Sequence, residues 1–154
     1  MNNVGVDALQ SVVEKLQNAA ETLGVNAIDI ARTYDPQADA ENLVEGETIV
    51  RVWLQDINIE GETEDQGTEK AVKISVGMLT GISDKSAETL DPLVNRFEDL
   101  LNLIVSWQEP WETDAGNRFC CTEAESIDIL NPNVLKEGGA VISRLDLTLL
   151  TYSL

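Results

Sequence analysis

The chain has 154 residues and is strongly acidic, with 28 Asp and Glu against 10 Lys and Arg, a formal net charge of −18 and no histidine. Without histidine it lacks the commonest general base, the commonest metal ligand and the usual partner of a catalytic serine or cysteine, so the composition argues against an enzyme and against a bound metal or cofactor. The apolar runs fall short of the roughly 18 residues that cross a bilayer, the N-terminus does not read as a signal peptide, and the surplus of carboxylates repels phosphate, so neither a membrane nor specific nucleic-acid binding is expected.

Residues 7–23 are predicted to form an amphipathic helix, because apolar side chains recur there at the spacing of one helix face. These apolar residues are Leu9, Val12, Val13, Leu16, Ala19, Ala20 and Leu23. Asp7 is suited to cap the first turn, and Gly24 stands where a left-handed residue ends a helix. Beyond it, residues 27–30 are expected to form a short strand and residues 34–41 a polar loop, whose acids do not follow the spacing of a calcium-binding loop.

A long hairpin is predicted next, from strands over residues 48–59 and 70–79. Both faces of the first strand begin apolar, so its first half is expected to be covered on both sides. Strict alternation places one set of side chains together: Ile49, Arg51, Trp53, Gln55, Ile57 and Ile59. The stretch between the strands, residues 60–69, is expected to be a long acidic hairpin loop. It exceeds what a turn requires, so it is expected to be either disordered or an arm that contacts a partner. Its acids are Glu60, Glu62, Glu64, Asp65 and Glu69.

A second amphipathic helix is predicted to begin at Asp91, which caps it, with Pro92 in the first position, where proline is well tolerated. Its apolar face comprises Leu93, Val94, Phe97, Leu100, Leu101, Ile104 and Trp107. Leu103 falls off this face and is expected to be exposed. The loop over residues 108–117 carries Trp111 at its centre, and this tryptophan is expected to be the most exposed of the three.

Two further strands are predicted over residues 118–130 and 141–154, with a helical turn or loop over residues 133–139 between them. The order of helix, hairpin, helix and two strands predicts a single α+β domain over residues 1–154. We expect a mostly antiparallel sheet of about four strands with two main helices packed on one face.

Candidate chemistry is sparse along the whole sequence. It contains no dinucleotide fingerprint, phosphate-binding loop, serine-nucleophile elbow or zinc-protease helix. Glu123 and Glu125 share a strand face, which suits a paired-carboxylate mechanism, but solvated side chains on an exposed face are the favoured interpretation. The adjacent Cys120 and Cys121 are expected to be free thiols, because a disulfide between neighbours is strained and two cysteines are too few for a zinc site.

Four segments together resemble a known family. They are the N-terminal helix VDALQSVVEKLQ, the hairpin IVRVWLQDINI to KAVKISVGML, the helix DPLVNRFEDLLNLIVSW and the closing strand AVISRLDLTLLTYSL. In the order of these segments and in their pattern of residues, the chain resembles the tail terminator proteins of tailed bacteriophages, which are also called tail completion or tail-to-head joining proteins. The resemblance covers nearly the whole chain and lies in architecture rather than in a diagnostic motif.

The resemblance implies a non-enzymatic virion protein, assembled in the host cytoplasm. In that family an α+β subunit forms a hexameric ring that terminates the tail tube and joins it to the head connector. In contractile phages the ring also meets the sheath, and DNA passes through its lumen without specific binding. The acidic residues 60–69 would line that lumen, where they would repel DNA in transit, or would reach a neighbour. The interface candidates are Trp53, Leu103, Trp107 and Trp111, since tryptophan is enriched at interface anchors.

Other interpretations of the acidic sequence stay open. A tail-tube or connector-ring subunit would share the same order of segments and pattern of residues. An inhibitory binding protein that mimics DNA would instead arrange carboxylates along one face to occupy a basic site on another protein. For Trp53 and Trp107, burial in the core of a monomer is as plausible as an interface. The concentration of acids near the predicted hairpin loop, rather than in a stripe along a helix, favours the structural virion protein.

Overall fold

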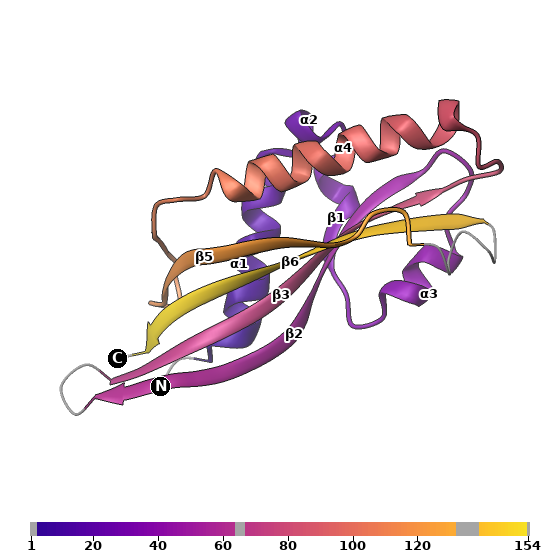
Figure 1. Cartoon of the computed structure of the whole chain (residues 1–154). Coiled ribbons are helices and arrows are strands. Elements are labelled where there is room, and N and C mark those ends of the chain that lie inside the picture. Colours follow the sequence, from indigo (N-terminus) through magenta and orange to yellow (C-terminus); the bar gives the residue numbers. More distant parts are fainter. Residues whose placement is uncertain (1–2, 64–66, 132–138, 154) are drawn as a thin grey trace.

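Over residues 3–63, 67–131 and 139–153, which the computed structural model describes, the chain forms a single α+β domain around one mixed six-stranded sheet (Figure 1). The helical elements are α1 (Val4–Asn18), α2 (Ala20–Leu23), the 3-10 turn η1 (Ala27–Asp29), α3 (Pro36–Glu41) and α4 (Ala87–Val105). The strands are β1 (Ile30–Arg32), β2 (Thr48–Thr63), β3 (Gly67–Gly81), β4 (Trp111–Glu112), β5 (Arg118–Asp128) and β6 (Ala140–Ser153). The α+β prediction is confirmed, whereas the prediction of about four strands is only roughly right.

Four long strands form the body of the sheet and pair antiparallel in the order β2, β3, β6, β5. Two short strands flank them. β1 pairs parallel with β2 over three residues, and β4 pairs antiparallel with β5 at Trp111 and Glu112. Strands this short contain too few alternating residues to give a clear pattern. The sequence therefore predicted a strand over residues 27–30, where η1 stands, and a loop where β4 lies.

Both main helices, α1 and α4, pack against the same face of the sheet, which we call the covered face, as predicted. The buried residues there include Leu9, Val12, Leu16, Phe97, Leu100, Ile104, Val52, Ile74 and Leu147. On the other side α3 covers one end of the sheet, where Ala40 lies with Ile49, Leu79 and Ile142. The first half of β2 is thus covered on both sides, as expected. The remainder of this second side, which we call the open face, lies in front of α1 in Figure 1 with no described helix over it.

A β-bulge in β2 changes which side chains share a face. The pairing of β2 with β3 shifts register between Leu54 and Asp56. β2 accommodates one extra residue there, so the side chains from Asp56 to Ile59 lie on the face opposite to the one that strict alternation predicts. Strict alternation predicted Ile57 and Ile59 beside Trp53, and this was wrong. Beyond the bulge both isoleucines lie on the covered face with Leu54, where Ile57 reaches the first turn of α1. Asp56 moves to the open face instead.

The first helix begins earlier than predicted and is interrupted near its end. α1 starts at Val4, because Val4 and Ala8 extend its buried stripe. Asp7 therefore lies within the first turn rather than capping it. Ala19 separates α1 from α2, and Gly24 ends α2 with a φ of 69°, which confirms the predicted left-handed stop.

The chain contains two Asp-Pro pairs, of which one begins a helix and the other lies inside a helix. Asp35 caps α3 and Pro36 occupies its first turn, so residues predicted to form a polar loop are helical. The same pattern at Asp91 and Pro92 lies inside α4, which begins after Ser86, whose side chain is the actual cap. The prediction of a start at Asp91 was wrong because the capping signal does not show which of two competing starts a helix adopts.

The acidic stretch over residues 60–69 is mostly strand rather than loop. β2 continues to Thr63 and β3 begins at Gly67, and those two residues pair with each other. β6 supports this end of the hairpin as well, since Ser153 pairs with Thr68. Only residues 64–66 lie between the two strands, and they fall outside the described residues. The prediction of a ten-residue loop was wrong because a third strand extends the ladder.

The last part of the chain follows the predicted order. The strand predicted over residues 118–130 ends at Asp128, and the one predicted over residues 141–154 is β6. The turn predicted over residues 133–139 lies almost wholly outside the described residues. No helix in the described part of the chain is long and apolar enough to span a membrane.

Candidate interaction surfaces

The described residues include no group of three or more Cys, Asp or Glu side chains placed to hold a metal ion. Cys120 and Cys121 are free and half-buried. Burial raises the pKa of the Cys121 thiol, which disfavours the reactive thiolate. The features with functional potential are therefore surfaces and a cleft.

Two of the predicted interface tryptophans form an aromatic cluster with the body of the protein. Trp107 and Trp111 meet edge to face at 6.0 Å between ring centroids, and Trp111 also contacts Phe119 at 6.2 Å. The Lys15 ammonium lies 4.5 Å from the Trp111 centroid and 5.2 Å from that of Trp107. Trp111 is half-buried, as Trp53 and Trp107 are, and its Nε1–H donates to Ser11 Oγ at 3.3 Å.

Asp7 provides a second link between α1 and the segment around β4. Its carboxylate accepts hydrogen bonds from the Thr113 hydroxyl and from Asn117 Nδ2, the latter at 2.7 Å. Asn117 is fully buried. The residue predicted as a helix cap thus fixes the turn of the β4–β5 hairpin onto α1. Together with the aromatic cluster, this contact gives Trp107 and Trp111 a structural role within the subunit.

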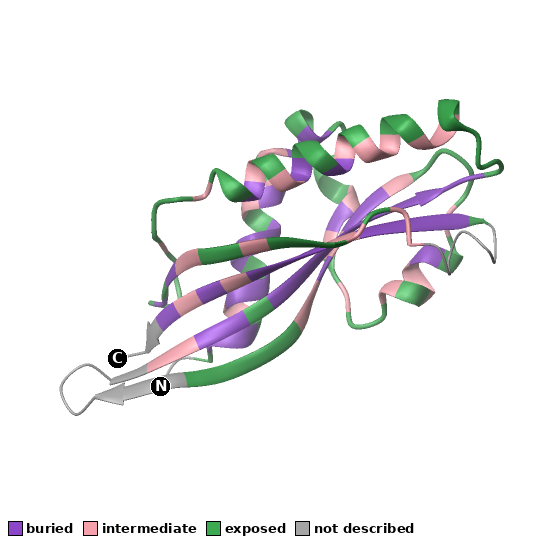
Figure 2. Ribbon diagram, viewed as in Figure 1, coloured by how far each residue is buried: buried purple, intermediate pink, exposed green. Residues whose placement is uncertain are grey.

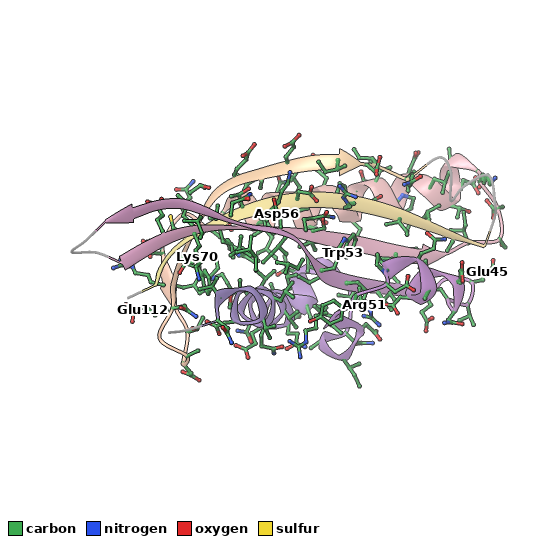
Figure 3. All side chains as sticks on the ribbon, turned by 90° about the horizontal axis from the view of Figure 1, so that it is seen from below. Glu45, Arg51, Trp53, Asp56, Lys70 and Glu112 are labelled. Carbon is green, nitrogen blue, oxygen red and sulfur yellow. The ribbon has the colours of Figure 1, made fainter. Side chains whose placement is uncertain are left out.

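The other two interface candidates differ from each other in their position. Leu103 was expected to be exposed, but it is half-buried and packs against the core under α4. Trp53 lies half-buried on the open face, where its indole covers the backbone of β3 (Figure 3). A Cβ at Gly77 would lie 2.8 Å from two atoms of this indole, so only glycine leaves room for it. Of the four candidates, Trp53 is the one that lies on the open face.

A polar network is buried at the centre of the open face. Asp146 is 4% exposed and accepts a hydrogen bond of 2.5 Å from the Ser75 hydroxyl. Ser75 in turn accepts from Gln55 Nε2 at 2.7 Å. Arg144 Nε lies 3.2 Å from one Asp146 oxygen, and Lys73 Nζ lies 3.9 Å from the other. Each residue comes from one of three neighbouring strands, so the network ties β2, β3 and β6 together across the surface.

The network could have been anticipated only in part from the sequence. Asp146 interrupts the apolar run of β6, which includes Leu145, Leu147 and Leu149, and an acid between buried leucines indicates a second face with its own environment. The partners Ser75 and Gln55 carried no such signal, because they are brought to Asp146 only by strand register and by the bulge in β2.

Exposed carboxylates border the network along β5. Glu123 pairs opposite Thr148 and Glu125 opposite Asp146. Both glutamates share the open face, as predicted, and both are exposed. No ion pair links either carboxylate to a cation among the described residues. Glu123 also lines a pocket of about 350 Å³ between β5 and the end of α4, but Glu125 does not, so the two carboxylates do not share a cleft.

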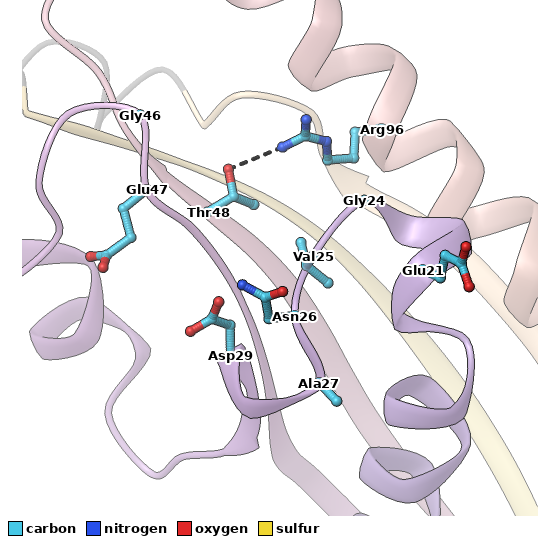
Figure 4. Close-up of a pocket in the computed structure, with 10 residues that line it drawn as sticks. All are labelled: Glu21, Gly24, Val25, Asn26, Ala27, Asp29, Gly46, Glu47, Thr48 and Arg96. Atoms are coloured by element: carbon cyan, nitrogen blue, oxygen red, sulfur yellow. Dashed lines mark hydrogen bonds between the residues drawn. The ribbon is translucent and has the colours of Figure 1, made fainter.

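A cleft of about 820 Å³ lies between the end of α2, the start of β2 and α4 (Figure 4). Arg96 projects into it and donates to Thr48 Oγ1 at 3.3 Å. Three carboxylates line the cleft, with Glu21 on one side and Asp29 and Glu47 on the other. Half of the lining residues lie in loops and most of the lining is polar, so the cleft lacks the enclosed, largely apolar walls of a typical ligand pocket.

The outer half of β2 forms an exposed edge with apolar side chains, shown in green in Figure 2. β1 pairs with β2 only as far as Val52, so from Trp53 onward no described strand pairs with this edge. Ile57 and Ile59 are 42% and 63% exposed there, and Val6 on the adjoining turn of α1 is 51% exposed. We call Val6, Ile57 and Ile59 the β2 edge patch.

The acidic residues predicted to line a lumen lie at the far end of the same hairpin. Glu60 and Glu62 belong to β2, and Glu69 belongs to β3, where it is half-buried. Glu64 and Asp65 lie outside the described residues.

No model of a known protein family matches the chain, and a search of curated proteins returns no match.

Proposed function

We propose that this protein is a non-enzymatic structural subunit of a phage virion, which forms a ring at the tail–neck junction, terminates the tail tube and joins it to the head connector. The resemblance of the sequence to tail terminator proteins suggests this role, and the α+β fold is compatible with it. The partners in this proposal are further copies of the chain, the tail tube, the head connector and, in a contractile tail, the sheath.

The observation that supports assembly best is the β2 edge patch. A long strand with an unpaired edge and exposed isoleucines is a liability for a monomer, because it invites association. A subunit that contacts its neighbours head to tail uses such a patch to close a ring. The patch contains two isoleucines spaced two residues apart, Ile57 and Ile59, so both face the same side of the strand.

The contact is expected to use these side chains rather than to extend the sheet. The Asp56 carboxylate accepts a hydrogen bond from the backbone N–H of Ile57 at 2.9 Å, and Asn58 Nδ2 donates to the same carboxylate. A charged side chain that occupies a backbone donor, together with the nearby bulge, disfavours the addition of another strand. The neighbouring subunit would therefore pack over the patch from the side of α1.

Negative-stain electron microscopy of the purified protein at low and high concentration tests the proposal. Six-fold rings with an open centre are expected, and Ile59→Glu should abolish them, because it places a charge in the contact. Ile28→Glu is the matched control, since Ile28 is 88% exposed and lies outside the patch. Open-ended tubes would indicate a tail-tube subunit instead. Compact monomers at every concentration, also in the presence of tail tubes, would overturn the proposal.

A further inference from the structure

The open face is a broad surface whose residues come from four strands. At its centre, neighbouring positions across the sheet are Trp53 in β2, Ser75 in β3, Asp146 in β6 and Glu125 in β5. In the next row of paired residues across the sheet, Asp56 in β2 stands at one border and Glu123 in β5 at the other. Lys73 and Thr148 lie between them, and the bulges in β2 and β5 separate the two rows. No described helix covers these rows, and Figure 3 shows Trp53 and Asp56 along the strand that leads away from α3.

Most cations of this face are already used inside the subunit. The exception is Arg118, which is exposed at the start of β5, opposite Tyr152. Arg51 pairs with Asp39 at 3.1 Å, while Arg144 and Lys73 both pair with the buried Asp146. Three of the ten cations of the chain thereby have a carboxylate partner within the subunit. In the rows around Asp146, what remains free to attract a partner is negative charge.

The carboxylates of the same face are exposed and lack such partners. Asp56, Glu123 and Glu125 are exposed at its two borders, and no ion pair joins them to a cation in the described part of the chain. Asp56 bonds only to neighbours in its own strand. The face therefore combines a neutralised centre with negative borders, an arrangement that is complementary to a positively charged surface.

Trp53 supplies an apolar anchor beside this centre, because it stands in the border strand β2 and its indole reaches over β3. It is half-buried, held over the backbone of β3 at Gly77, and surrounded by a network that fixes its neighbours. A large, rigid, amphipathic side chain on a surface with a polar rim is the typical composition of an interface hot spot.

We propose that the open face docks a lysine- and arginine-rich surface of another protein, with Trp53 as its apolar anchor and Asp56, Glu123 and Glu125 at the rim. The inference rests on the proposed function in that this partner is a neighbour of the subunit in the assembly. A second copy of the chain does not suit the face, because each copy has a net charge of −18 and the cations around Asp146 are already paired with it. Nucleic acid does not suit it either, because phosphates would meet exposed carboxylates.

The first test uses a synthetic amphipathic helix of leucine and lysine as the probe, titrated into the full chain at low and at physiological salt. We expect binding that weakens with salt, and a control peptide with glutamate in place of lysine should not bind. Glu123→Gln with Glu125→Gln should weaken binding about two- to tenfold, since each exposed charge pair contributes little by itself. Glu88→Gln with Glu98→Gln on α4 removes the same charge from another exposed surface and should have no such effect.

The second test locates the peptide through the three tryptophans. In fluorotryptophan-labelled protein, the fluorine resonance of Trp53, assigned with Trp53→Phe, should shift on addition of the lysine peptide. The resonances of Trp107 and Trp111 should not shift, because their cluster lies on the other side of the sheet. Equal weakening by the two double variants, a shift confined to the aromatic cluster, or tighter binding of duplex DNA than of the peptide would each overturn the proposal.

The same variants separate this inference from the proposed function. Glu123→Gln with Glu125→Gln should leave rings intact in electron micrographs, and Ile59→Glu should leave peptide binding intact. Rings without peptide binding would overturn only the docking surface. Peptide binding without rings would overturn only the ring, and such a protein, if DNA competes for its basic partner, would fit the DNA mimic.

Discussion

The two sides of the central sheet are buried in different ways. On the covered face, β6 contributes Leu145, Leu147 and Leu149, all fully buried beneath α1 and α4. One position along, on the open face, the same strand contributes Arg144, Asp146 and Thr148. Asp146 is nearly as inaccessible as the leucines, yet it is enclosed by the side chains of its own face rather than by a helix.

This difference shows what each side is suited to do. Apolar packing is strong and non-directional, so the covered face stabilises the domain without fixing the direction of each contact. Hydrogen bonds and ion pairs are directional, so the network on the open face holds its surface side chains in defined places at little net gain in stability. A surface arranged in advance loses less entropy when it binds a partner, which is a reason to keep such a network.

The largest effect is expected on the covered face. Leu147→Ala should lower the free energy of unfolding by about 2–5 kcal/mol, because it removes buried methyl groups and leaves a cavity between the sheet and its helices. Urea denaturation followed by circular dichroism measures the change. Leu150→Ala is the matched control in the same strand, half-buried on the open face. If both substitutions cost the same, the two faces do not differ in packing as described.

Asp146→Ala is expected to have the next largest effect, about 2–3 kcal/mol, since it leaves the buried Ser75 hydroxyl without its acceptor and removes the carboxylate that pairs with the half-buried Arg144. Glu125→Ala, directly opposite Asp146 but exposed, should change stability by less than about 0.5 kcal/mol. The same urea series measures both variants. A negligible effect of Asp146→Ala would show that the network does not contribute to the free energy of unfolding.

The contrast between the faces also limits what the sequence reveals. Apolar periodicity identified both main helices, the long strands and their packing on one side, because burial against a helix leaves a repeat of fixed period. The bulge at Leu54 and Asp56 left no such repeat, and one inserted residue moved Ile57 and Ile59 to the opposite side. The Asp146 network depends on register between strands that are distant in the chain, which no local pattern encodes. The interaction surfaces therefore emerged only from the three-dimensional arrangement.

The smallest effect concerns an acid that is buried on neither face. Asp84 lies before α4, where its carboxylate accepts hydrogen bonds from the Ser86 hydroxyl, the Thr89 hydroxyl and the Ser86 backbone N–H. These bonds, the Ser86 hydroxyl first, lower the pKa of Asp84 below its ordinary value. Because the folded pKa is the lower one, the stabilisation is fully present above the unfolded pKa, at about pH 4, and is lost as the pH falls through the folded pKa.

Asp84→Asn should therefore be slightly less stable than the parent at neutral pH and indistinguishable from it once the carboxylate is protonated. Urea denaturation of both proteins at about pH 7 and about pH 3 gives the difference at each pH, and the shared response of the other acids cancels. Asp114→Asn, an exposed acid for which no hydrogen-bonded cap is seen in the described residues, is the control and should show no such dependence. A difference that grows towards low pH would have the wrong sign and would show that the Ser86 and Thr89 hydrogen bonds favour the protonated acid. Set beside Asp146→Ala, the result contrasts two acids that both accept a hydrogen bond from a serine hydroxyl. Asp146 is buried within a sheet face and also pairs with cations, whereas Asp84 is exposed to solvent.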